Sequence, residues 1–249
     1  MRDLRAVYIL WLRDIKKYRY DKVRIIASLG QPLLFLFVFG TALSPAFEGG
    51  GGIRFSKFIF PGIISMTVLF TSIFSAISIV WDREFGLLKE VLIAPVSRWS
   101  IVIGKALGGS TVAVIQGSIM LLLAPLIGAK LSLLIFLKSV LVMYLIALSM
   151  TGLGIMIVAR MKEMEGSQMI INFVIMPIFF LSGALFPLDG LPEWLTLLTR
   201  IDPLTYGVDL MRRIMLGVNT FNPLADIVVI FSFMLITFAI SVIEINLSE

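Results

Sequence analysis

Six segments of the chain contain no Asp, Glu, Lys or Arg, and they constrain the fold more than any other feature. They cover residues 25–47, 58–81, 106–129, 139–159, 166–188 and 227–243. A helix needs roughly 17–25 mostly apolar residues to cross the hydrocarbon layer of a bilayer, and these segments are 17–24 residues long. The sequence therefore predicts an all-α membrane protein with six transmembrane helices, forming a single domain over residues 1–249.

The composition supports a chain that is solvated by lipid. Hydrophobic residues make up 59% of it and charged residues 15%, whereas soluble domains have roughly 45–50% and about 25%. There is no cysteine and no histidine, which excludes disulfides, thiolate chemistry, histidine bases and nearly every zinc or haem site. We interpret the formal net charge of +5 as basic loops beside a membrane, and we expect no nucleic-acid partner.

The distribution of lysine and arginine predicts the orientation. With six spans, segments 1–24, 82–105, 160–165 and 244–249 share one side of the membrane. That side carries 14 basic residues and the other side carries 7. Because basic residues are enriched in cytoplasmic loops, we expect both termini to lie in the cytoplasm.

Residues 1–24 have the pattern of an amphipathic helix. Apolar residues recur at helical spacing, and the basic residues fall largely elsewhere on the helical wheel. This pattern predicts a helix that lies in the membrane interface, as an anchor or as a contact for a cytoplasmic partner. The apolar stripe consists of Leu4, Tyr8, Trp11, Ile15 and Tyr18.

The loop over residues 82–105 is too long for a tight turn. Trp81, Phe85, Leu88 and Leu92 form one helical stripe beside charged residues, and Pro95 ends the pattern. The loop therefore predicts a short cytoplasmic helix with one apolar and one charged edge. Such a helix suits docking on another protein, although a helix lying on the membrane gives the same pattern.

Residues 189–226 predict a pair of short helices on the outer side. The first helix has Pro192 near its first turn, and Asp202 is placed to cap a second helix that begins at Pro203 and runs to about Ile214. Because this stretch is mostly apolar, we expect the pair to be re-entrant and to dip into the outer leaflet.

Small and polar residues inside the spans are typical of helix packing. Gly104 and Gly108 form a GxxxG pattern, and Gly152 and Gly154 are also small. Gln116 is polar, and a hydrogen bond between helices explains it better than substrate binding does.

The polar segments together resemble the membrane subunit of type-2 ATP-binding-cassette (ABC) exporters. The first matching motif is Arg83-Glu84-Phe85-Gly86 followed by Leu88, Glu90, Leu92, Pro95-Val96 and Gly104-Lys105. The second is FFLSGALFPLDGLPEWL at 179–195, followed by DPLTYGVDLMRR at 202–213. The order, spacing and six-span topology match the family over essentially the whole chain. The sequence departs from the family pattern at Asp202, where Asn is usual, at Phe85-Gly86-Leu87 and at Lys89.

The resemblance implies a role for each polar segment. Segment 82–105 would carry a coupling helix that contacts an ABC ATPase, and segment 1–24 would be a second contact, with Tyr8, Trp11 and Ile15 on the interface helix. The hairpin 189–226 would help to close an outer gate. The implied ATPase contacts are Arg83, Glu84, Phe85, Gly86, Leu88, Glu90, Leu92 and Pro95. The implied outer-gate residues are Ser182, Gly183, Phe186, Pro187, Trp194, Pro203 and Tyr206.

The resemblance also implies the partners and the location. Two ABC ATPase subunits would bind a homodimer of this chain, or a pair of this chain and a similar permease, in the plasma membrane. This chain would hold no cofactor, and ATP and Mg would bind the partner ATPase. The sequence agrees, because Gly104-Lys105 is followed by Ala106 and no phosphate-binding GxxxxGK[ST] loop is present.

Several functions remain open. The exported substrate is an amphipathic small molecule, a drug or a lipid-like compound, or alternatively a polysaccharide or lipid-linked glycan. A secondary transporter is less favoured, because the six segments contain no ionisable residue that could carry a proton or ion near the midplane. A membrane enzyme is also disfavoured, because no histidine and no clustered catalytic carboxylates are available.

Overall fold

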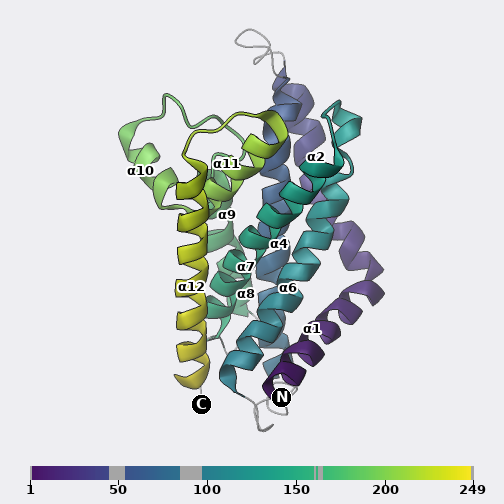
Figure 1. The fold of residues 1–249 in the computed structure, drawn as a ribbon, viewed down its shortest axis with the longest axis vertical. Helices are drawn as coiled ribbons and strands as arrows, with labels where there is room; N and C mark the ends of the chain where they lie inside the picture. The colour runs from purple at the N-terminus through teal and green to yellow at the C-terminus, as the bar shows by residue number, and fades with distance from the viewer. Residues whose placement is uncertain (1, 45–53, 85–96, 160, 162–164, 248–249) are drawn as a thin grey trace.

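The computed structural model describes residues 2–44, 54–84, 97–159, 161 and 165–247. These residues form a bundle of helices and contain no strand (Figure 1). In chain order the helices are α1 (Arg2–Tyr20), α2 (Lys22–Ala42), α4 (Phe55–Glu84), α6 (Arg98–Leu121), the 3₁₀ helix η1 (Ala124–Ile127), α7 (Leu133–Val158), α8 (Glu165–Ile170), the π-helix η2 (Ile171–Ile175), α9 (Met176–Leu181), α10 (Glu193–Ile201), α11 (Pro203–Leu216) and α12 (Pro223–Leu247).

Five of the helical stretches in the described residues are long and apolar enough to cross a membrane. They are Ile25–Ala42, Phe55–Asp82, Arg98–Ile127, Leu133–Val158 and Pro223–Glu244. The all-helical class and five of the expected spans are therefore confirmed. The span expected at 106–129 begins earlier, at Arg98, because Lys105 lies inside the helix and is neutralised there by carboxylates from neighbouring helices.

The sixth expected span, 166–188, differs from the other five. The chain is helical there over Glu165–Leu181, but the helix is divided into α8, η2 and α9. A proline removes one backbone donor and clashes with the preceding turn, and the wider π turn lies directly before Pro177. The helix ends at Leu181 with Ser182 as its C-cap, and Gly183 follows with φ of +66°.

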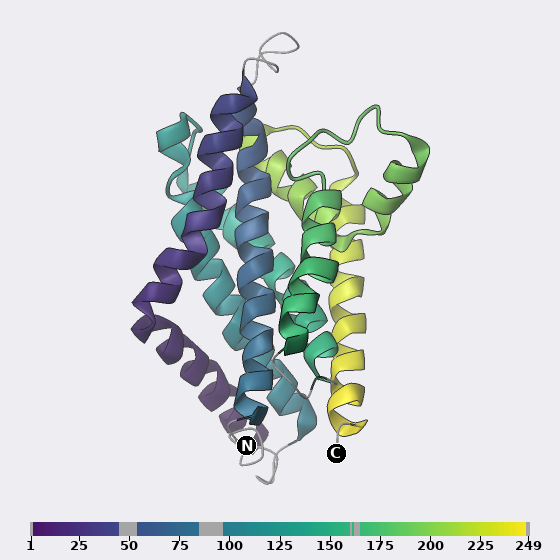
Figure 2. The same ribbon diagram turned by 180° about the vertical axis from the view of Figure 1, so that it is seen from behind.

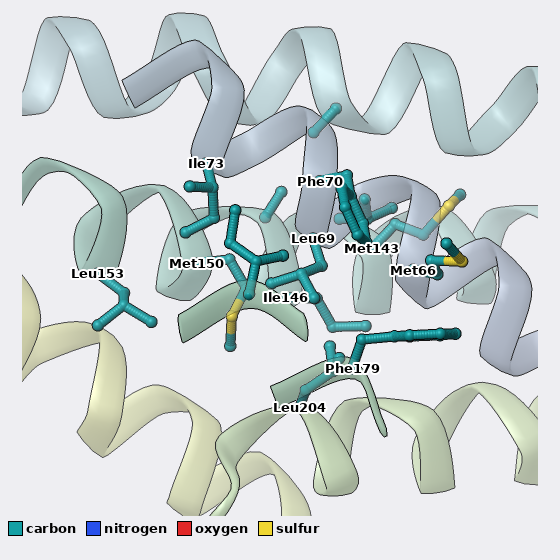
Figure 3. Close-up of a cluster of buried hydrophobic side chains, with 14 of the residues drawn as sticks. Met66, Leu69, Phe70, Ile73, Met143, Ile146, Met150, Leu153, Phe179 and Leu204 are labelled. Atoms are coloured by element: carbon teal, nitrogen blue, oxygen red, sulfur yellow. The ribbon is translucent and has the colours of Figure 1, made fainter. Parts of the chain in front are cut away.

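Helix α4 is the centre of the bundle. In its membrane-spanning stretch 78% of the residues are buried, compared with 17% in α2. Figure 3 shows its side chains Met66, Leu69, Phe70 and Ile73 packed against residues of α7, α9 and α11. Helix α2 therefore lies at the edge of the bundle and α4 is enclosed. The neighbours labelled in this cluster are Met143, Ile146, Met150, Leu153, Phe179 and Leu204.

Glycines let the helices approach α4 and α7 closely. A Cβ atom at Gly154 would lie 2.6 Å from the Ala76 Cβ of α4, and one at Gly152 would lie 2.6 Å from the Thr237 Oγ1 of α12. The predicted packing role of these two residues is confirmed.

Gly62 gives a sharp test of this packing. A Cβ atom at Gly62 would lie 2.3 Å from the backbone oxygen of Ala184, which cannot move as a side chain can. We expect Gly62→Ala to lower the free energy of unfolding by about 2 kcal/mol through overpacking, measured as a lower thermal midpoint in detergent.

Gly30 is the matched control for this substitution. It lies inside α2, and a Cβ atom there would meet nothing within 4 Å. Gly30→Ala should leave stability unchanged or raise it by up to about 1 kcal/mol through helix propensity. Equal midpoints for the two variants would contradict the packing described for Gly62.

Candidate functional site at the two ends of the bundle

The candidate coupling site lies at the end of the bundle where α4 ends and α6 begins, which we call the loop end. Both termini lie near this end (Figure 1). Of the expected ATPase contacts, Arg83 and Glu84 belong to the last turn of α4. The other expected contacts fall within 85–96, outside the described residues, so the coupling helix stays a prediction. These are Phe85, Gly86, Leu88, Glu90, Leu92 and Pro95.

Helix α1 packs along α6 and runs in the same direction. Near its start, the Asp3 Oδ1 accepts hydrogen bonds from the Ser97 backbone N–H at 2.8 Å and the Ser100 hydroxyl at 2.9 Å. These bonds lower the pKa of Asp3, the Ser97 backbone bond most of all. Further along, the Trp11 Nε1 donates to the Thr111 Oγ1 at 3.0 Å. Helix α1 is therefore attached directly to α6, from the start of α6 onward.

Glycines of α6 make room for α1. A Cβ atom at Gly104 would lie 3.0 Å from the Leu10 Cβ, and one at Gly108 would lie 2.7 Å from the Asp14 Oδ2. The close packing predicted for this GxxxG pair is confirmed, and the structure identifies α1 as the helix that occupies it. The buried side of α1 includes Leu10 and Asp14, whereas Tyr8 of the predicted stripe is exposed.

Four charges join α1, α4 and α6 at the loop end, and we call them the ion cluster. The Lys105 Nζ lies 2.7 Å from the Asp82 Oδ2 and 3.4 Å from the Asp14 Oδ1. The Arg13 Nη2 lies 2.5 Å from the same Asp82 oxygen. Lys105 is only 4% exposed, so its charge is balanced from inside the protein.

Sequence reasoning missed the ion cluster. Its one available signal was Asp14, an acidic residue three positions after Trp11 and four before Tyr18, on the apolar side of the amphipathic helix. Removing one partner of a buried ion pair costs about 3–5 kcal/mol, because the other charge stays buried. The cluster therefore holds three helices in one arrangement.

Gln116 fastens the region where α1 turns into α2. Its side chain is hydrogen-bonded to the Tyr18 hydroxyl, and its Nε2 donates to the Ser28 Oγ at 2.8 Å and the Ile25 carbonyl at 3.2 Å. The expectation that Gln116 bonds between helices is confirmed. Because Tyr18 belongs to α1 and Ser28 to α2, a single side chain of α6 connects both.

The opposite end of the bundle, which we call the hairpin end, carries the two short helices expected there. Helix α10 follows Pro192, and α11 begins at Pro203. Asp202 caps α11, because its Oδ1 accepts the Leu204 backbone N–H at 3.0 Å. The predicted pair of helices and the predicted cap are confirmed, while the depth of the pair in a membrane stays a prediction.

The expected outer-gate residues lie at the hairpin end but do not form one cluster. Ser182 and Pro203 are buried, and the Ser182 hydroxyl donates to the Phe179 carbonyl at 2.7 Å. The Tyr206 hydroxyl donates to the Arg200 carbonyl at 2.7 Å. Phe186 is half-buried and Pro187 exposed on the loop before α10, and Trp194 is exposed on α10.

Arg212 connects the parts of the hairpin end. It is 3% exposed, its Nη2 donates to the Gly183 carbonyl at 2.7 Å, and its guanidinium carbon lies 4.1 Å from the centre of the Phe58 ring. Burial lowers its pKa to about 10, so it stays charged at neutral pH. Arg212 thus joins α11, the turn after α9 and the start of α4. It was not among the gate residues expected from the sequence.

Comparison with known proteins places this arrangement among transport permeases. Residues 5–216 match the profile of a family described as ABC-2 type transporter. The chain is 28% identical over 216 residues to a protein of Cyanophora paradoxa named putative transport permease ycf38, an alignment covering 84% of this chain and 73% of that one. It is 30% identical to nodulation protein J of Rhizobium leguminosarum bv. trifolii, covering 82% and 76%.

A third relative carries a more specific name. The chain is 31% identical over 166 residues to a protein of Escherichia coli (strain K12) named probable multidrug ABC transporter permease YbhR. That alignment covers 64% of this chain and 44% of the relative.

The role of Arg212 at the hairpin end can be tested by substitution. We expect Arg212→Met to lower the free energy of unfolding by about 2 kcal/mol, because the Gly183 carbonyl and the Phe58 ring both lose a charged partner. The measurement is the thermal midpoint of the purified chain in detergent. Arg213→Met is the control, since Arg213 is exposed, and an equal effect of both substitutions would contradict the assignment.

Asp202 predicts a dependence of stability on pH. Burial raises its pKa to about 8, whereas an Asp in an unfolded chain has a pKa of about 3.9. Between these values the folded state binds more protons than the unfolded state, so the contribution of Asp202 to stability falls as pH rises from about 4 to about 8.

Asp202→Asn should remove this dependence. Asn keeps the oxygen that accepts the Leu204 N–H and caps helices as well as Asp does. We expect a higher thermal midpoint than the wild type at about pH 8.5 and a smaller difference at about pH 5. The exposed Asp189 supplies the control variant Asp189→Asn. Parallel midpoint-against-pH curves for the wild type and Asp202→Asn would show that Asp202 does not titrate in this window.

Proposed function

Because this chain belongs to the ABC-2 type transporter family, we propose that it is the membrane-spanning permease subunit of an ATP-driven exporter that works with a separate ABC ATPase. The observation that carries this proposal is the ion cluster. It joins the interface helix α1 to the end of α4 and to α6, which are the two arms of the loop expected to meet the ATPase.

Rigid arms suit the transmission of force. A push by a partner on segment 85–96 would move α4 and α6, and α1 would move with them because buried ions and hydrogen bonds hold it against α6. Breaking the buried ion pairs would cost several kcal/mol. The coupling contacts proposed for the ATPase are those expected from the sequence, Arg83, Glu84, Phe85, Gly86, Leu88, Glu90, Leu92 and Pro95.

ATP and Mg belong to the partner in this proposal. The sequence has no phosphate-binding loop, and the described residues include no group of three His, Cys, Asp or Glu side chains that could hold a metal ion. Two ATPase subunits would serve two permeases, either two copies of this chain or this chain with a similar permease.

The proposed topology has six passes through the plasma membrane. Helices α8, η2 and α9 make the sixth crossing as one interrupted helix. With the loop end in the cytoplasm, both termini lie there, in agreement with the excess of basic residues on that side. The hairpin end then faces outward, where Ser182, Gly183, Phe186, Pro187, Trp194, Pro203 and Tyr206 would form the outer gate.

The substrate proposed is an amphipathic small molecule, a drug or a lipid-like compound. The name of the relative YbhR, a probable multidrug permease, supports this class. A permease for a polysaccharide or lipid-linked glycan is the alternative, and a secondary transporter is less favoured because family membership points to an ATPase partner.

The proposal is tested by reconstituting the chain with its ABC ATPase in liposomes and following export of a fluorescent drug. Export must depend on ATP hydrolysis and disappear without the ATPase. Export that continued without nucleotide would contradict an ATP-driven permease.

The ion cluster should matter for coupling as well as stability. We expect Lys105→Met to reduce export by about ten-fold while the ATPase subunits still hydrolyse ATP, because α1 and α4 no longer share a charge partner on α6. The double variant Lys105→Met with Asp82→Asn removes one positive and one negative charge, so it leaves no unbalanced charge buried in the cluster. We expect this variant to recover the thermal midpoint of the wild type but not its export.

Lys138 provides the control for this substitution. It lies exposed in α7, and Lys138→Met should leave export unchanged. Normal export by both Lys105 variants would show that the cluster is not needed for coupling.

A further inference from the structure

A cavity of about 510 Å³ lies between α2, α4 and the end of α1. Helix α1 ends at Tyr20, Asp21 is not helical and α2 begins at Lys22, so the two helices meet at an elbow (Figure 2). The cavity fills the inside of this elbow, and we call it the elbow cavity. Neither the ion cluster nor the hairpin end uses it.

The cavity exists because α2 touches α4 along only part of its length. In its second half, Leu36 is buried and a Cβ atom at Gly40 would lie 3.2 Å from the Ser56 Cβ. In its first half, the hydrogen bonds from Gln116 of α6 fasten the Ile25 carbonyl and the Ser28 hydroxyl. The first half of α2 is therefore held beside α6, and the space between it and α4 stays open.

The wall of the cavity on α4 is apolar and aromatic. Met66, Phe70 and Phe74 line it at successive turns of the helix, and Trp81 lies further along the same helix. The same helix also places the hydroxyl residues Thr71 and Ser78 in the lining, and the Ser78 hydroxyl donates to the Ser75 carbonyl at 2.6 Å. A wall of this kind binds aliphatic and aromatic groups by burial and offers few hydrogen bonds. A sugar chain has many hydroxyl groups that each need a partner once they leave water, and most of them would find none on this wall.

The charged groups of the lining come from the elbow. Lys17 lies in the last turn of α1 and Asp21 directly follows the helix, and they add one positive and one negative charge. Gln31 of α2 adds an amide. A cation would be repelled by Lys17, and an anion would be repelled by Asp21. An uncharged dipolar or a zwitterionic head group can interact favourably with both side chains.

The size of the cavity suits one small molecule. Sites for drug-sized ligands have volumes of about 300–1,000 Å³ and are mostly apolar with a few polar groups, which describes this cavity. We propose that the elbow cavity binds a single uncharged or zwitterionic, drug-sized amphiphile, with its apolar body against α4 and its polar group toward Lys17 and Asp21. The inference rests on the proposed function, and it adds the place where the substrate binds and the charge that the substrate carries.

The test is direct photolabelling of the full chain in lipid nanodiscs. The probe is azidopine, an uncharged, aromatic, drug-sized photoreactive compound, and the labelled peptides are identified by mass spectrometry. We expect labelling to concentrate on the α2 and α4 segments that line the cavity, and to be displaced by the zwitterionic amphiphile dodecylphosphocholine but not by maltohexaose.

Two alanines of α2 provide the matched variants. Ala27 lines the cavity, and Ala27→Phe fills open space without compressing a packed core. Ala42 is exposed on the same helix and is not part of the lining, so Ala42→Phe is the control. We expect Ala27→Phe to reduce labelling by about ten-fold, a loss of about 1.4 kcal/mol in binding, with unchanged labelling in Ala42→Phe and equal thermal midpoints.

Three results would overturn the proposal. One is labelling that survives in Ala27→Phe, and another is displacement by maltohexaose, which would favour a glycan. The third is labelling spread over all lipid-facing helices, which would mean that bilayer lipid occupies the cavity. Binding needs no ATP, so a wild type that binds azidopine at this site but shows no ATP-driven export would contradict the proposed function alone.

Discussion

A lysine buried in a membrane-spanning helix needs its charge balanced within the protein, and this requirement organises one half of the molecule. Lys105 of α6 meets Asp82 at the end of α4 and Asp14 of α1. These contacts bring α1 onto the glycines of α6, and that position determines where α1 can turn into α2. The position of α1, together with the Gln116 hydrogen bonds to the first half of α2, therefore sets the elbow at Asp21 and the cavity inside it.

A second buried cation organises the other half. Arg212 binds the Gly183 carbonyl and lies over Phe58, near the start of α4, while Lys105 binds Asp82 near its end. The central helix is thus held at both ends by cations from neighbouring elements, and its middle is held by apolar packing (Figure 3). A force applied at one end of α4 would reach the other along one continuous helix.

This arrangement separates a fixed part of the molecule from a less constrained one. Helices α4, α6 and α1 are joined by buried ions, whereas α2 is mostly unburied and contacts α4 along only part of its length. Under the proposed function, an amphiphile in the elbow cavity would lie between the fixed part and α2. Movement of the loop end would then change the shape of the binding site without changing the hydrophobic core.

The sequence by itself determined those helices whose position depends on residues that are close together in the chain. Five of the spans could be predicted from segments without charged residues, because lipid solvates only apolar side chains. The start of α11 could be predicted from Asp202 and Pro203, because a helix cap involves only residues that are close in sequence. The motifs also led to the family. The sequence also led us to expect a sixth span over 166–188, but the division of the helix at 165–181 by a π turn has no signal in the pattern of charges.

Only the tertiary structure decided which distant residues meet. Nothing in the spacing of Asp14, Asp82 and Lys105 shows that one ammonium group serves both carboxylates, because their distances depend on how three helices pack. Arg212 was visible as a residue of a motif, yet its partners Gly183 and Phe58 come from other elements. The elbow cavity is likewise a space left between helices, and such a space is set by packing in three dimensions and has no signature along the chain.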